Sequence, residues 1–260
     1  MTAHDPQAAA TFIVRLRQTG ERVAALPAAL APPDLEAAYA TQDRVRTLLA
    51  SPVSGWKIGA TATPVQAKFA ISEPMAGPFF APETHASPAR LPASAFTQRA
   101  IESEFAFRFA RSLAPRADGY SRDEILAAVD ALVPAIEIVS TRFTSLLFDH
   151  VTTAVADCVL NAGFVLGAPV VDWRHLDLAA HPVRLSIDGR EVATGSGAAV
   201  LGHPFTVLDW AVAHLGRRGI AIEPGQIIST GTTTGIVVME PGQTARADFG
   251  TLGAVELTLT

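Results

Sequence analysis

Two glutamates lie close together in the stretch AIESEFAFRFA, where the alternation of apolar residues is typical of a buried strand. Side chains two residues apart in a strand point to the same face, so Glu102 and Glu104 should share a face with Ala106 and Arg108. Burying such like charges costs several kcal/mol or raises their pKa. The pair therefore either lies on a solvated face with Arg108 as partner, or belongs to a site that requires negative charge.

A third glutamate interrupts an apolar run on both faces in LVPAIEIVS, residues 132–140, a pattern that predicts a strand buried on both sides. Two interpretations of Glu137 are open. It forms a buried ion pair, for instance with Arg142 or Arg99, or it joins Glu102 and Glu104 around a hard divalent cation such as Mg²⁺ or Mn²⁺. Zinc fits poorly, because the seven histidines and the single cysteine show no recognisable ligand spacing.

Lys57 lies in another short apolar run, GWKIGAT. A lysine in such a place commonly extends its ammonium group to the surface. The alternative is a lysine beside a cation, where burial and the metal charge lower its pKa so that it can take up a proton near neutral pH.

The elements that position these residues can be outlined from hydrophobic periodicity. Residues 1–50 are predicted to form a helical region, with Asp34 as the N-cap of one helix. Residues 51–260 are rich in short β-branched and aromatic runs, with an Asp188-Gly189 hairpin turn, and three helices are predicted at 121–132, 153–167 and 204–219. Ser121 and Glu124 form a capping box. The fold class is α+β, a curled mixed sheet with flanking helices.

Composition narrows the function further. The formal charge of −5 and the absence of a lysine or arginine block argue against a nucleic-acid partner. Prolines and charges interrupt each apolar run before the ~18 residues that a membrane span needs. The first residues lack the pattern of a secretory signal, so we expect a cytoplasmic protein that acts on small molecules.

Several sequence motifs follow one another in the order in which they occur in a known protein family. GWKIGAT, IESEFAFRFA, PAIEIVSTRF, NAGFVLG, GQIISTGTTTG and ADFGTLGAVELTL, with AYATQ upstream, resemble the 2-keto-4-pentenoate hydratase and 4-oxalocrotonate decarboxylase family of the fumarylacetoacetate hydrolase superfamily. The resemblance spans nearly the whole chain. It implies a fumarylacetoacetase-like fold, Mg²⁺ or Mn²⁺, and a 2-oxo or 2-hydroxy-dienoic acid that chelates the ion, in the catabolism of aromatic compounds.

The resemblance also implies roles for individual residues. Glu102, Glu104 and Glu137 match the metal ligands of the family, Lys57 matches its catalytic lysine, and Thr232 matches a threonine near the substrate. For Thr232, turn and strand propensity is the plainer explanation. The family also forms oligomers, so a homo-oligomer is expected.

The chain departs from the family pattern at two places. Met75 stands where hydratases carry an aspartate that handles protons, and Leu160 or Asn161 stands where a serine is expected. These departures leave the proposed metal ligands and Lys57 intact, so hydration remains the first prediction. Decarboxylation or another C–C lyase reaction is the second, and a weakly active partner subunit of a related decarboxylase is the third. Lys68, Arg90 and Arg99 are the basic residues that could meet a second substrate carboxylate, with solvated surface as the alternative.

Overall fold

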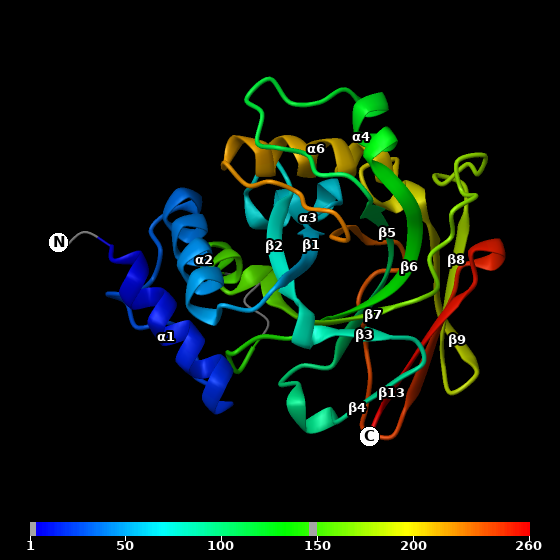
Figure 1. Ribbon diagram of the computed structural model, residues 1–260. Coiled ribbons are helices and arrows are strands. Elements are labelled where there is room, and N and C mark those ends of the chain that lie inside the picture. Colours follow the sequence, from blue (N-terminus) through cyan, green and yellow to red (C-terminus); the bar gives the residue numbers. More distant parts are fainter. Residues whose placement is uncertain (1–3, 146–149) are drawn as a thin grey trace.

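The computed structural model describes residues 4–145 and 150–260 (Figure 1). Its larger sheet is strongly curled, and a second sheet packs beside it. The larger sheet has the order β2 (Met75–Phe80), β1 (Val53–Gly59), β10 (Ile227–Thr232), β5 (Ala100–Phe109), β6 (Val129–Val139), β7 (Asn161–Leu166) and β3 (Thr84–Ala86), with β11 (Val237–Val238) also paired to β5. The second sheet has the order β4 (Ala89–Leu91), β13 (Ala254–Leu259), β12 (Thr244–Asp248), β8 (Pro182–Ile187) and β9 (Arg190–Ser196).

The curl of the larger sheet brings its two ends together. Phe79 of β2 and Phe164 of β7 lie with ring centroids 4.4 Å apart, although four other strands separate β2 from β7 along the sheet. The inner face of the curl carries these rings with Ala106 and Ala135, and the outer face of β5 and β6 packs its large apolar residues against the second sheet. The described strands thus form a curled half-barrel, and the α+β fold class is confirmed.

Helices cover the ends of the curl. In Figure 1, α1 (Pro6–Thr19) and α2 (Leu35–Leu49) lie on one side of the sheet, while α4 (Arg122–Ala128) and α6 (Pro204–Arg217) lie along the top of the view. The remaining helices are α3 (Thr63–Phe69) and α5 (Val151–Ala156). Ile13 and Val45 of the first two helices share one hydrophobic cluster with Phe80 and Val139 of the sheet. The division of the chain at residue 50 stays a prediction. None of the helices that these residues form has the length and apolar character needed to cross a lipid bilayer.

The helix caps and the hairpin turn predicted from the sequence are confirmed. Asp34 accepts a hydrogen bond from the backbone of Ala37 as the N-cap of α2, and Ser121 with Glu124 forms the capping box of α4. Asp188 and Gly189 join β8 to β9 with positive φ angles of 51° and 80°.

Two predicted helices are wrong in part. The helix predicted at 121–132 ends at Ala128, because Val129 already begins the buried strand β6. The helix predicted at 153–167 ends at Ala156, and Asn161–Leu166 instead forms β7, which pairs with β6 and β3. In both cases strand pairing outweighs the local helical periodicity. The short helix α3 was not predicted.

Candidate active site

Strand register brings the three glutamates together. Glu102 of β5 pairs directly with Glu137 of β6, and Glu104 lies one same-face position further along β5. One carboxylate oxygen from each of the three lies within 4.8 Å of the others, and all three side chains are buried or nearly so. The sequence prediction that these residues converge is therefore met by the geometry, while their role as metal ligands stays a prediction.

The arginines considered as alternative partners are engaged elsewhere. Arg108 pairs with Asp130, Arg142 pairs with Asp157, and Arg99 pairs with Glu240. Burial of the glutamates excludes the solvated face that the sequence left open. The ion pairs exclude the arginine-paired glutamate.

In Glu104 and Glu137, only one of the two carboxylate oxygens accepts hydrogen bonds. Oε2 of Glu104 accepts hydrogen bonds from the hydroxyl of Ser229 and from the backbone N–H of Gly231, the latter at 3.0 Å. Oε1 of Glu137 accepts a hydrogen bond from Asn161 at 2.9 Å. The other oxygens, Oε1 of Glu104 and Oε2 of Glu137, are buried and have no hydrogen-bond partner among the described residues. Buried carboxylate oxygens without partners are costly, so this donor set fits a hard divalent cation.

Burial and mutual repulsion oppose ionisation of the cluster. Burial raises the pKa of Glu102 to about 7, although the Lys57 ammonium acts in the opposite direction. Burial, together with the charges of Glu137 and Glu102, raises the pKa of Glu104 well above its ordinary value. A cation bound between them would lower the pKa of both glutamates, since an opposite charge favours the ionised carboxylate.

Lys57 does not extend to the surface, because its side chain is only 4% exposed. Its ammonium lies 3.1 Å from Oε1 of Glu137 and donates a hydrogen bond of 3.1 Å to the carbonyl of Val159. Burial lowers the pKa of Lys57, but the charges of Glu137, Glu102 and Glu104 outweigh it and the pKa is raised. This direction is opposite to the lowering expected beside a divalent cation, because three carboxylates stabilise the ammonium form.

A left-handed turn presents the Val159 carbonyl to Lys57. Cys158, Val159 and Leu160 have φ angles of 55°, 54° and 63°, and such a backbone costs about 1–2 kcal/mol per non-glycine residue. The turn packs tightly on β2, since a Cβ atom at Gly77 would lie 2.4 Å from the Cys158 carbonyl oxygen. Tertiary contacts must therefore hold this turn in place.

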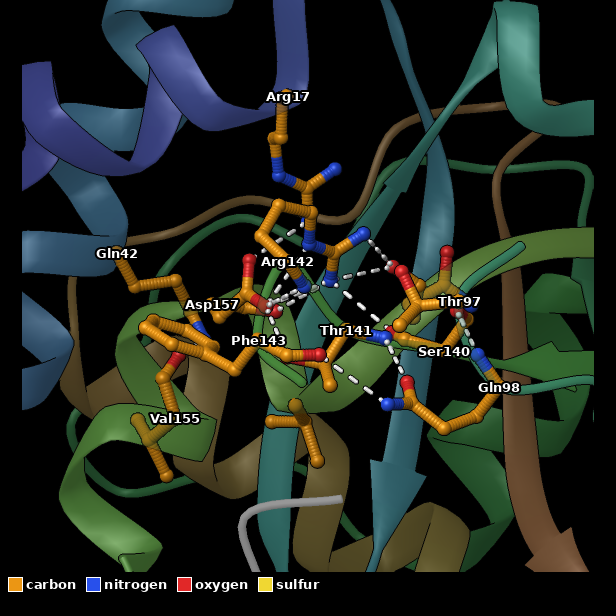
Figure 2. Close-up of polar contacts among 12 residues, drawn as sticks. Arg17, Gln42, Thr97, Gln98, Ser140, Thr141, Arg142, Phe143, Val155 and Asp157 are labelled. Carbon is orange, nitrogen blue, oxygen red and sulfur yellow. Dashed lines mark hydrogen bonds and ion pairs between the residues drawn. The ribbon is translucent and has the colours of Figure 1, made fainter. Parts of the chain in front are cut away.

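A buried ionic network flanks the turn (Figure 2). Asp157, immediately before the turn, pairs with Arg142 at 2.8 Å and with Arg17 of α1 at 3.5 Å. Thr141 donates a further hydrogen bond to Asp157, and Arg142 donates to the carbonyl of Asn161, immediately after the turn. Arg142 thus ties both ends of the turn together, and Arg17 connects it to the N-terminal helix.

A cavity of about 350 Å³ opens beside the glutamates. Lys57, Glu102 and Thr232 line it, as do Met75 and Leu160, so the residues of the two departures from the family pattern face the candidate site. Thr232 donates its hydroxyl to the carbonyl of Gly235, and its role with a substrate stays a prediction.

Sequence reasoning did not find three contributors to this site. They are Ser229 and Gly231, which hold Glu104, and the carbonyl of Val159, which holds Lys57. The only sequence signal for the first two was the motif GQIISTGTTTG. From the sequence, Asn161 was considered only as a residue standing where the family carries a serine. In the structure its amide donates a hydrogen bond to Glu137.

Comparison with known proteins assigns this chain to a family. Residues 58–260 match the C-terminal domain of fumarylacetoacetate (FAA) hydrolase. The chain belongs to the fumarylacetoacetate hydrolase family. It is 31% identical over 258 residues to a 2-keto-4-pentenoate hydratase of Paraburkholderia xenovorans (strain LB400), an alignment that covers 98% of this chain and 95% of the relative.

Two further proteins are informative. The chain is 31% identical over 202 residues to a 2-hydroxyhexa-2,4-dienoate hydratase of Comamonas testosteroni, which covers 76% of this chain and 75% of that protein. A 4-oxalocrotonate decarboxylase from Pseudomonas putida G7, solved with magnesium and adipate, superimposes with a TM-score of 0.89 at 23% identity over 98% of this chain and 97% of that chain. This superposition supports the same fold for the two proteins.

Proposed function

We propose that this family member is a metal-dependent hydratase that adds water to a 2-hydroxy-2,4-dienoate and forms a 4-hydroxy-2-oxo acid. The observation that carries the proposal is the cluster of Glu102, Glu104 and Glu137 beside Lys57, with Glu102 and Lys57 lining a cavity. The hydratase names of the two relatives described above agree with it.

Glu102, Glu104 and Glu137 would hold Mg²⁺ or Mn²⁺. The ion would supply a positive charge that stabilises the negative charge developing on the 2-oxygen of the substrate. The magnesium in the decarboxylase structure supports a magnesium site of this kind. The apolar wall of the cavity would exclude bulk water from the reacting atoms, which strengthens the electrostatic interactions there.

Lys57 would move the protons. Hydration first converts the dienol into the unsaturated 2-oxo acid: the 2-hydroxyl loses a proton and the far end of the diene gains one. Water then adds its oxygen to carbon 4 and a proton to carbon 3. Lys57 lines the cavity and is held by Glu137 and the Val159 carbonyl, so its ammonium is positioned for such transfers. Met75, in place of the aspartate of other hydratases, cannot share this task.

A decarboxylase acting on a 4-oxalocrotonate-type dicarboxylate is the alternative, because a decarboxylase has the same fold and the same enolate chemistry would serve it. An ultraviolet assay with Mg²⁺ or Mn²⁺ separates the two. Hydration of 2-hydroxypenta-2,4-dienoate, with the 4-hydroxy-2-oxo acid identified by NMR, is the expected result. Release of CO₂ from the dicarboxylate without hydration would replace the proposal with the alternative.

Other expectations stay proposals of the same kind. A homo-oligomer and association with a related decarboxylase follow from the resemblance to the family, and a cytoplasmic location stays an expectation from the sequence. Size-exclusion chromatography with light scattering would give the oligomeric state directly.

A further inference from the structure

A second cavity, of about 300 Å³, lies apart from the candidate active site. Residues of α1, β3, β4 and β7 line it, together with the segments beside them, and no described residue lines both cavities. Three arginines, Arg17, Arg22 and Arg142, belong to this lining, and Glu83 is the one carboxylate among the described lining residues. The proposed function assigns no role to this cavity.

Arg17 lies in the cavity wall with part of its hydrogen-bonding capacity unused. Its side chain is only 7% exposed, and its Nη1 donates a hydrogen bond of 3.0 Å to Glu83. Its Nε and Nη2 have no hydrogen-bond partner among the described residues, and Nη2 lies 3.5 Å from the carboxylate of Asp157. A buried guanidinium in this state is costly, because its donors have lost water without gaining a full set of acceptors. The wall therefore favours a ligand that brings acceptor oxygens.

Positive charge exceeds negative charge around this cavity. Arg17 and Arg142 share Asp157 as their counter-charge (Figure 2). Burial and the charge of Arg17 lower the pKa of Arg142, although Asp157 acts in the opposite direction. Arg22 donates to the hydroxyl of Thr97 and to a backbone carbonyl, and it pairs with none of the carboxylates in the described part of the chain. Three guanidinium groups thus share two carboxylates, and a bound anion would balance the excess charge.

The rest of the wall favours an anion with an apolar body. Its larger apolar residues are Pro82, Leu91, Pro92 and Phe96. Leu91 and Phe96 also pack against the main hydrophobic core, which fixes their positions. A compact inorganic anion would leave this apolar surface in contact with water, whereas a carboxylate on a small ring or chain would cover it. A volume of about 300 Å³ is sufficient for such a ligand.

We propose that this cavity is a second binding site, separate from the glutamate cluster, for a small organic monocarboxylate. The planar guanidinium groups of Arg17, Arg22 and Arg142 match the two oxygens of a carboxylate, and the apolar body of the ligand packs against Leu91 and Phe96. Binding at this site requires no metal ion. The proposal is therefore independent of the proposed function, and either one can fail without the other.

Benzoate is a suitable probe, because it carries one carboxylate on a rigid apolar ring. Isothermal titration calorimetry of the full chain with Mg²⁺ present should show that benzoate binds. Benzyl alcohol, which lacks the charge, and inorganic phosphate, which lacks the apolar body, should bind at least about tenfold more weakly. Absence of benzoate binding would overturn the proposal, and equal binding of phosphate would overturn the assigned class of ligand.

A variant of the glutamate cluster distinguishes the two sites. Benzoate held by a metal ion at the cluster would lose affinity in Glu104→Gln, which removes one proposed ligand of that ion. Benzoate held by the arginines should bind Glu104→Gln with an affinity within about twofold of wild type, since Glu104 does not line the second cavity. Loss of benzoate binding in Glu104→Gln would therefore overturn the proposal.

An isosteric pair of substitutions at Ala95 locates the site. Ala95 lines the cavity and is exposed, so a longer side chain there displaces no buried group. Ala95→Glu places a negative charge beside the ligand and should weaken benzoate binding by about fivefold, whereas the uncharged Ala95→Gln serves as its control. Equal affinity of these two variants for benzoate would contradict binding in this cavity.

Removal of one lining cation provides a further test. Arg22→Gln should weaken benzoate binding by about fivefold, the size expected for a partly exposed ion pair. Arg190→Gln on β9, outside this cavity, removes the same charge from the protein and should leave the affinity within about twofold. Equal losses in the two variants would show that benzoate responds only to net charge, and would overturn the proposal.

Discussion

The side-chain amide of Asn161 donates a hydrogen bond of 2.9 Å to Oε1 of Glu137, the same oxygen that lies 3.1 Å from the Lys57 ammonium. Both partners therefore hold the same oxygen, Oε1, and their contacts fix the orientation of the carboxylate. The other oxygen, Oε2, has no hydrogen-bond partner among the described residues. Asn161 in this way fixes the orientation of a proposed metal ligand.

Removal of this amide should weaken metal binding. Asn161→Ala is expected to lower Mn²⁺ affinity by about 10–100-fold, the usual effect of losing a group that orients a ligand. Calorimetry of Mn²⁺ binding measures it directly. Gln66→Ala is the control, since the Gln66 amide donates to the backbone carbonyl of Ala60 and not to a ligand. Equal affinity in wild type and Asn161→Ala would contradict the orienting role.

Loss of one charge from the glutamate cluster should separate folding from metal binding. Glu104→Gln keeps an oxygen to accept from Ser229 and Gly231 but removes a buried negative charge. We expect the metal-free variant to be at least as stable as wild type, and the stabilisation of wild type by added Mg²⁺ to be lost. Thermal unfolding with and without Mg²⁺ measures both, with Glu256→Gln, an exposed carboxylate of β13, as control. Wild-type stabilisation by Mg²⁺ in Glu104→Gln would remove Glu104 from the ligand set.

The role of Lys57 in proton transfer can be distinguished from the role of its charge. Lys57→Met should reduce kcat by about 100-fold or more while Mn²⁺ still binds. Lys57→Arg keeps a cation near Glu137 but cannot release a proton near neutral pH, so it should be impaired to a similar degree. Steady-state kinetics together with Mn²⁺ titration test this. High activity in Lys57→Arg would show that charge, not proton transfer, is what Lys57 supplies.

The sequence predicted the glutamate cluster because alternation within a strand determines which side chains share a face. Glu102 and Glu104 needed only that local rule, whereas the pairing of Glu137 with Lys57 is a contact between distant strands that spacing alone does not specify. The turn at Cys158–Leu160 could not be predicted, because three consecutive non-glycine residues with positive φ have no local preference for that conformation. Tertiary contacts hold both ends of the turn, since Arg142 pairs with Asp157 and donates to the carbonyl of Asn161.

The buried network around Asp157 should be far more sensitive to substitution than an exposed ion pair. Asp157→Asn would leave the buried Arg17 and Arg142 without their shared counter-charge, and we expect a loss of about 3–5 kcal/mol in the free energy of unfolding. Glu256→Gln, which breaks the exposed pair with Arg246 at 2.7 Å, should cost less than about 1 kcal/mol. Urea unfolding of both variants gives the comparison. Similar small losses in the two would show that the network around Asp157 does not stabilise the fold.

His214 of α6 should make the protein less stable in mild acid. Its ring lies between Tyr39 and Trp210, at centroid distances of 4.9 and 4.6 Å, and burial, reinforced by the charges of Arg218 and Arg217, lowers its pKa from 6.5 to about 3. Because the unfolded chain binds the proton more readily, this contribution to stability is complete above pH 6.5 and is lost as the pH falls toward 3.

The pH dependence can be isolated by a substitution that keeps the ring. Between pH 6.5 and 5, one such histidine contributes a slope of up to about 1.4 kcal/mol per pH unit, and His214→Phe should remove that slope while it retains aromatic packing. Other groups titrate in the same range, including Glu102, whose raised pKa of about 7 gives a slope of opposite sign, so the difference between wild type and variant is the quantity to measure. Urea unfolding at a series of pH values supplies it, with His175→Gln at an exposed site as control. If wild type and His214→Phe lose stability in parallel as the pH falls, His214 is not buried in its neutral form.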